Sequence, residues 1–150
     1  MSVAFRRESD DEHLEPKFEV PIPPGPNLVT ARGKALIEER IAALEGRLAA
    51  APLDEVEAIR RDLRYWHTRR ATAIETAAPT DGAIGFGSVV DTLFDGRART
   101  LAIVGDDEAD PKAGYIGFSA PLARALIGAE AGDVLPFAGR DEAIEVIAVR

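Results

Sequence analysis

The chain has 150 residues, of which 46% are hydrophobic, and its formal net charge at pH 7 is −8. This length and composition allow one domain, or two small ones, with a substantial apolar core. An acidic chain is a poor candidate for binding nucleic-acid phosphates, so we expect no direct, sequence-specific nucleic-acid partner. Cysteine is absent, which excludes disulfide bonds and thiolate metal sites.

The sequence contains no signal for a membrane or for a cofactor. No apolar run approaches the roughly 20 residues of a membrane span, and the N-terminus lacks the apolar stretch of a signal peptide. We therefore expect a cytoplasmic monomer with no membrane partner. The two histidines, His13 and His67, lie far apart in the sequence and offer no metal-ligand spacing. We expect no metal site and no cofactor of the protein's own.

Residues 1–27 are predicted to form a disordered or extended tail. Charges of both signs alternate early in this segment. Pro21, Pro23, Pro24 and Pro26 then oppose helix formation and favour an extended, stiff chain. A peptide that binds a partner is the alternative for this segment.

Residues 28–79 are predicted to form an antiparallel helical hairpin. Thr30 suits a helix N-cap, and Pro52 ends this first helix after about 21 residues. Asp54 begins a second helix, with Glu57 in the capping-box position. Apolar side chains in both helices repeat with coiled-coil spacing, and a tight turn joins the helices. The predicted seam positions are Ile37, Ile41, Leu44 and Leu48, then Val56, Ile59, Leu63, Trp66, Arg70 and Ala73.

The tip of this hairpin carries Asp54, Glu55 and Glu57, whose simplest role is to cap the helix and compensate its dipole. The second helix is also rich in arginine and holds Tyr65 and Trp66. This side of the hairpin is either a solvated face or a surface that contacts the acidic walls of a protein channel. The candidates for such channel contacts are Arg60, Arg64 and Arg69.

Residues 83–150 are predicted to form a small curved β-sheet packed on one helix. Residues 88–94 and 97–104 form a hairpin around the turn Asp95-Gly96, and further strands span residues 115–118, 134–137 and 143–149. The single helix follows Ser119, a suitable N-cap, with Pro121 in its first turn and Gly128 at its left-handed end. The predicted fold class is therefore α+β, an N-terminal helical hairpin followed by a small sheet domain.

The acidic segment after the second strand of this domain invites comparison with a calcium loop. It contains Asp106, Asp107, Glu108 and Asp110. An EF-hand loop needs glycine at its sixth position and glutamate at its twelfth, where this chain has Pro111 and Gly117. We expect a solvated loop or a contact with a protein partner instead.

Several segments resemble one known family. They are the helix of residues 119–128, the motif "VG-x-x-E-A-D" at residues 104–110, the start of the first strand at residues 86–90, and the start of the hairpin at residues 27–36. They are similar to segments of Gre factors, the bacterial transcription elongation factors that enter the secondary channel of RNA polymerase. The resemblance covers roughly residues 27–150. It implies an FKBP-like C-terminal domain and RNA polymerase as the partner. The implied docking residues are Ile116, Ser119, Pro121 and Leu122.

One feature of the family is missing. Gre factors carry an acidic tip motif whose carboxylates help hold the polymerase's second Mg²⁺ for cleavage of backtracked RNA. Here Asp62-Leu63 is followed by Arg64 rather than by the family's Ser-Glu-Asn. The hairpin is also about two dozen residues shorter, which removes roughly 17–18 Å of reach. The resemblance therefore implies a short-hairpin member, not itself an enzyme, that binds polymerase without stimulating cleavage.

Three alternatives stay open. The tip of Asp54, Glu55 and Glu57 could still stimulate cleavage if it reached the metal. The FKBP-like domain could be a prolyl isomerase, a class of enzyme that uses an aromatic pocket. The aromatic residues available to it are Phe86, Phe94, Tyr115, Phe118 and Phe137. The protein could also regulate another enzyme through the same docking helix.

Overall fold

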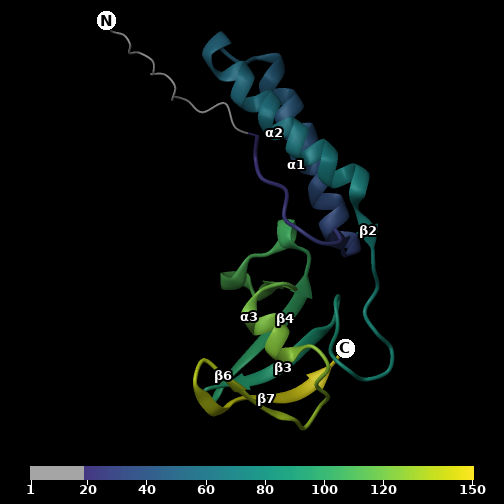
Figure 1. The fold of residues 1–150 in the computed structure, drawn as a ribbon, viewed down its shortest axis with the longest axis vertical. Helices are drawn as coiled ribbons and strands as arrows, with labels where there is room; N and C mark the ends of the chain where they lie inside the picture. Colours follow the sequence, from purple (N-terminus) through teal and green to yellow (C-terminus); the bar gives the residue numbers. More distant parts are fainter. Residues whose placement is uncertain (1–18) are drawn as a thin grey trace, which may run out of the picture.

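The computed structural model describes residues 19–150, which form a helical hairpin at one end and a β-sheet domain at the other (Figure 1). Residues 1–18, with most of the predicted tail and with His13, lie outside the described part of the chain. Within residues 19–150, no helix is both long and apolar enough to cross a membrane.

The hairpin consists of α1 (Ala31–Ala49) and α2 (Leu53–Thr72). Thr30 is the N-cap of α1, and its Oγ1 accepts a hydrogen bond from the Gly33 amide at 3.0 Å, as predicted. The predicted seam is confirmed along most of its length, with Leu48, Trp66 and Ala73 packed at its margin. Its buried members are Ile37, Ile41 and Leu44 of α1 and Ile59 and Leu63 of α2.

Two details of the hairpin prediction are wrong. Pro52, not Asp54, precedes the first turn of α2, and no side chain caps this helix. Asp54 and Glu55 instead lie within the first turn, where negative charge favours the helix dipole. Arg70 was assigned to the seam but is exposed, with its guanidinium 3.3 Å from Glu38.

A short parallel pair of strands closes the base of the hairpin. β1 (Leu28–Val29) pairs with β2 (Ile74–Glu75), so that the chain enters and leaves the hairpin side by side. The side-chain amide of Asn27 donates to the Arg69 carbonyl at 2.8 Å and to Thr72 Oγ1 at 3.1 Å. These contacts hold Asn27 in place, and so they fix the end of the segment that precedes it.

The sheet domain has five strands in the order β5-β4-β3-β7-β6. They are β3 (Val89–Phe94), β4 (Arg97–Val104), β5 (Tyr115–Gly117), β6 (Val134–Phe137) and β7 (Arg140–Val149). Within this sheet, β4 and β5 pair in parallel, and the other neighbouring strands pair antiparallel. The predicted turn between β3 and β4 is present, with positive φ at Asp95 (51°) and Gly96 (80°).

A single α-helix, α3 (Pro121–Leu126), packs on one face of this sheet (Figure 1). Leu126 of α3 and the inward side chains of the strands, such as Leu101 and Ile144, are fully buried there. Two short 3-10 turns, η1 (Asp106–Glu108) and η2 (Pro111–Ala113), lie between β4 and β5. The predicted α+β class is confirmed, with the hairpin and the sheet domain each built around its own core.

Candidate functional site

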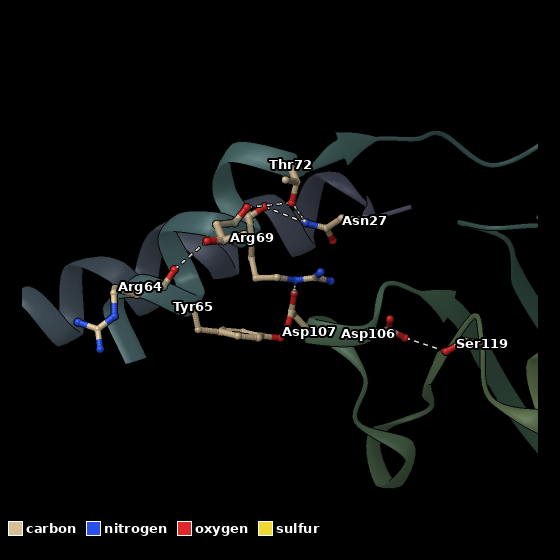
Figure 2. A network of polar contacts seen from close by, with 9 residues as sticks. Asn27, Arg64, Tyr65, Arg69, Thr72, Asp106, Asp107 and Ser119 are labelled. Carbon is tan, nitrogen blue, oxygen red and sulfur yellow. Dashed lines mark hydrogen bonds and ion pairs between the residues drawn. The ribbon is translucent and has the colours of Figure 1, made fainter. Parts of the chain in front are cut away.

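The acidic turn η1 connects the sheet domain to the hairpin. Asp107 Oδ2 accepts from Arg69 Nε at 2.6 Å, and Asp107 Oδ1 accepts from the Tyr65 hydroxyl (Figure 2). Arg69 is buried. Burial and the bond to Asp107 raise the pKa of Tyr65 above its ordinary range. Asp107 therefore belongs to the junction between the two parts.

Glu108 makes a second set of contacts at this junction. Glu108 is 5% exposed, and its carboxylate accepts from Thr30 Oγ1 at 2.6 Å and from Arg32 Nη1 at 2.8 Å. The Arg32 guanidinium also lies 3.9 Å from the centre of the Tyr115 ring. A Cβ at Gly33 would lie 2.6 Å from Glu108 Oε1, so any larger residue there would force the Glu108 carboxylate to shift. The expectation of a solvated loop or partner contact is thus wrong for Asp107 and Glu108.

Three arginines were predicted to face a channel, and the prediction is wrong for one of them. Arg69 is buried against Asp107 and is not available to a partner. Arg60 and Arg64 are exposed on α2. Arg64 lies within 2.6 Å of Glu19 and 3.4 Å of Glu57. Helical periodicity did not reveal that the Arg69 side faces η1, because the two are far apart in sequence.

The predicted docking residues near α3 also separate into two groups. Ile116 is 4% exposed and belongs to the core of the sheet domain, so its assignment as a docking residue is wrong. On this short strand it points inward to the apolar core. Leu122 is half-buried and packs against the same core. Ser119 and Pro121 are exposed.

Ser119 does not cap α3. The N-cap is Ala120, which makes no side-chain cap bond, and Ser119 Oγ instead donates to Asp106 Oδ1 at 2.9 Å (Figure 2). The hydroxyl lies one residue too early in the chain, because Pro121 occupies the first helical position. This bond ties the start of α3 to η1, next to the junction with the hairpin.

The tip of the hairpin is apolar at its very end. Leu53 is 93% exposed, directly after Pro52. Asp54, Glu55 and Glu57 are exposed, and Glu57 Oε2 lies 3.4 Å from the Arg64 guanidinium. Among residues 19–150, no three His, Asp or Glu side chains form a group that could hold a metal ion.

The aromatic residues considered for an isomerase pocket are divided among different contacts. Phe86 and Phe118 form one edge-to-face pair at 5.4 Å, and Phe94 and Phe137 form another at 5.8 Å. Tyr115 lies under Arg32 at the junction instead. Phe94, Phe118 and Phe137 pack against the core of the sheet domain. Packing accounts for these three side chains.

Comparison with known proteins identifies the sheet domain. Residues 79–150 match the family model "Transcription elongation factor, GreA/GreB, C-term". The chain is 36% identical over 121 residues to "Transcription elongation factor GreA" of Thioalkalivibrio sulfidiphilus, a match that covers 78% of this chain and 65% of that protein. It is 42% identical over 86 residues to the GreA of Allorhizobium ampelinum, which covers 55% of this chain and 54% of that protein. The chain thus spans less than two thirds of the length of these relatives.

Solved structures give further matches over most of the chain. "GreA factor homolog 1 (Gfh1)" of Thermus thermophilus is 19% identical, with a TM-score of 0.41, and the match covers 84% of this chain and 99% of that one. A "GreA/GreB" factor of Nitrosomonas europaea is 17% identical, with a TM-score of 0.39, covering 84% and 98%. The family model and the GreA relatives show that residues 79–150 form a GreA/GreB C-terminal domain, and the chain as a whole is similar to Gre factors.

Proposed function

We propose that this protein binds bacterial RNA polymerase, places its short hairpin in the secondary channel and modulates transcription elongation without stimulating transcript cleavage. Similarity to Gre factors supports the choice of partner, because the relatives are named transcription elongation factors. The protein works in the cytoplasm as a monomer. It carries no cofactor of its own and alters the polymerase's activity rather than catalysing a reaction itself.

The observation that carries this proposal is the structure of the hairpin, namely its short helices and its apolar tip. With 19 and 20 residues, α1 and α2 are only about 28–30 Å long. The end of the hairpin presents Leu53, 93% exposed, and the carboxylates that follow it do not form a metal-binding group among residues 19–150. A hairpin of this kind fits occupancy of a channel entrance better than delivery of acidic ligands to a distant metal.

The tip carboxylates are also poorly arranged for joint metal binding. Metal-assisted cleavage needs carboxylates that converge beside the ion. Asp54 and Glu57 share one helix face, but Glu57 is already 3.4 Å from Arg64. Glu55 projects about 100° away from Asp54 around the helix. These three side chains therefore serve α2 itself, through its dipole and its ion pair.

Docking of the sheet domain is proposed at the start of α3. Pro121 is an exposed apolar side chain at the first helical position, beside the exposed Ser119. Leu122 contributes only its outward edge, since its remainder packs on the core. This small surface lies next to η1, so a partner bound there would also be held in a defined position relative to the hairpin.

Three measurements on the full chain test the proposal. Binding to immobilised core RNA polymerase is expected, with no acceleration of transcript cleavage in a stalled elongation complex that holds a labelled backtracked transcript. Added together with a full-length Gre factor, this protein should slow that factor's cleavage in proportion to occupancy. Cleavage by this protein alone that vanishes in Asp54→Ala/Glu55→Ala would show that the tip acts on the metal. Failure to bind polymerase would refute the proposal as a whole.

A further inference from the structure

Residues 19–26, which we call the arm, run from the base of the hairpin to the middle of α2 (Figure 1). The base end is firmly fixed by Asn27, which is 6% exposed and hydrogen-bonds Arg69 and Thr72. Prolines at positions 21, 23, 24 and 26 stiffen the segment. Gly25, with φ of 85°, lies close to the fixed end and provides a bend there.

The other end of the arm is held by one charged contact. Glu19 accepts two hydrogen bonds from the Arg64 guanidinium, from Nε at 2.6 Å and from Nη2 at 2.9 Å. The bond to Arg64 lowers the pKa of Glu19 and raises that of Arg64. Both side chains are about half exposed, at 58% and 49%. An exposed ion pair of this kind is weak and screened by salt, so the contact opens and closes readily.

Between its two ends the arm does not pack tightly on the helix. A cavity of about 450 Å³ lies there, bounded by Val20 and Ile22 of the arm and by side chains of α2. The α2 side chains that line it are Arg64, Tyr65, His67 and Thr68. Ile22 remains 46% exposed. Because little apolar surface is buried, the Glu19–Arg64 contact largely decides whether the arm lies on α2.

We propose that the Glu19–Arg64 contact is an autoinhibitory latch, which keeps the arm across the arginine-bearing face of α2 and so competes with an acidic surface of the partner. Arg60 shares this face with Arg64, four residues away on the helix. The bidentate bond to Glu19 shows which chemistry the face accepts, namely a carboxylate. The inference rests on the proposed function, since the competing partner is RNA polymerase.

The first test removes the latch charge. Glu19→Ala in the full chain should bind core RNA polymerase about 1.5- to 5-fold more tightly than the unaltered protein, because a larger fraction of molecules has the face open. Glu75→Ala is the matched control. It removes one carboxylate from another exposed pair, with Lys34 at 3.7 Å, on β2 at the base of the hairpin and not at the Glu19 end of the arm. This control separates the loss of the latch from the general effect of a less negative chain.

The second test locks the arm shut. The chain has no cysteine, so Ile22→Cys/Thr68→Cys places two unique thiols on opposite walls of the cavity. A short bis-maleimide that joins them should weaken polymerase binding at least about fivefold relative to the same variant before cross-linking. Each single-cysteine variant, labelled with a mono-maleimide of similar size, controls for the added bulk.

The possible outcomes separate this inference from the proposed function. Tighter binding by Glu19→Ala, unchanged binding by Glu75→Ala and weaker binding after cross-linking would together support the latch. Equal binding by all forms would overturn the latch and leave the proposed function standing. Weaker binding by Glu19→Ala would mean that the arm belongs to the contact surface, which also overturns it. If the unaltered protein does not bind polymerase, both proposals fail.

Discussion

Arg69 Nε donates a hydrogen bond to Asp107 Oδ2 at 2.6 Å, and this contact joins α2 of the hairpin to η1 of the sheet domain (Figure 2). The two side chains are 3% and 12% exposed. Tyr65 donates to the other oxygen of the same carboxylate. Because both charges are largely removed from water, loss of either one would leave the other buried without a countercharge.

Loss of the Asp107 charge should strongly destabilise the protein. Asp107→Asn keeps the shape of the side chain but leaves the Arg69 guanidinium buried without a countercharge. We expect the free energy of unfolding to fall by about 3–5 kcal/mol, measured by urea denaturation. The control is Asp91→Asn, in an exposed pair with Arg150, which should cost less than about 1 kcal/mol. Equal small losses in both variants would show that the junction does not depend on this pair.

The junction should also weaken at alkaline pH through Tyr65. Burial and the bond to Asp107 raise its pKa above the ordinary value of 10.0. The unfolded chain therefore releases this proton at a lower pH than the folded protein does. Its contribution to stability is complete below about pH 10 and is lost as the pH rises beyond it. The free energy of unfolding, measured with urea, should fall between pH 9 and about pH 11. This fall should be smaller for Tyr65→Phe than for the unaltered protein. Identical pH dependence would contradict a shifted tyrosine.

Trp66 should contribute less to stability than a fully buried tryptophan does. Its ring lies at the margin of the hairpin core, 5.0 Å from the Tyr65 ring and 5.3 Å from the Arg40 guanidinium. Trp66→Ala should lower the free energy of unfolding by about 2 kcal/mol, against about 3–5 kcal/mol for complete burial. Leu63→Ala, at a 7% exposed position in the same core, should cost at least as much. A much larger loss for Trp66→Ala would show that the ring packs as a fully buried member of the hairpin core.

Pro121 offers the cleanest test of docking at α3. Pro121→Glu replaces an exposed apolar side chain with a carboxylate at a helix start, where negative charge is favourable. The domain should stay folded while binding to core RNA polymerase weakens at least about tenfold. Ala131→Glu places the same charge at an exposed site beyond α3 and should bind normally. Normal binding by Pro121→Glu would remove this surface from the proposed docking site.

Leu122→Asp should behave differently, because Leu122 packs against the core of the sheet domain. Circular dichroism and thermal unfolding of this variant should show a clear loss of stability. Its binding defect alone would therefore not identify a contact with the polymerase. An intact, equally stable Leu122→Asp variant would show that the side chain is free for a partner.

The sequence by itself determined the features that depend on neighbouring residues. The Thr30 cap, most of the seam and the turn at Asp95-Gly96 each rest on local spacing or on a local backbone preference. Gly128, with φ of 93°, takes the left-handed conformation predicted for the end of α3. The resemblance to Gre factors was also readable, because several short segments of the sequence are similar to segments of that family.

Only the tertiary structure decided which charged side chains meet. Arg69 and Asp107 are 38 residues apart, and nothing near either residue in the sequence marks the other as its partner. The same holds for Arg64 and Glu19, and for Glu108 with Thr30. Periodicity tells which side of a helix is apolar, but the partners of its charged positions depend on how the hairpin, the arm and the sheet domain come together. That is why Arg69, predicted to face a channel, is instead buried at the junction.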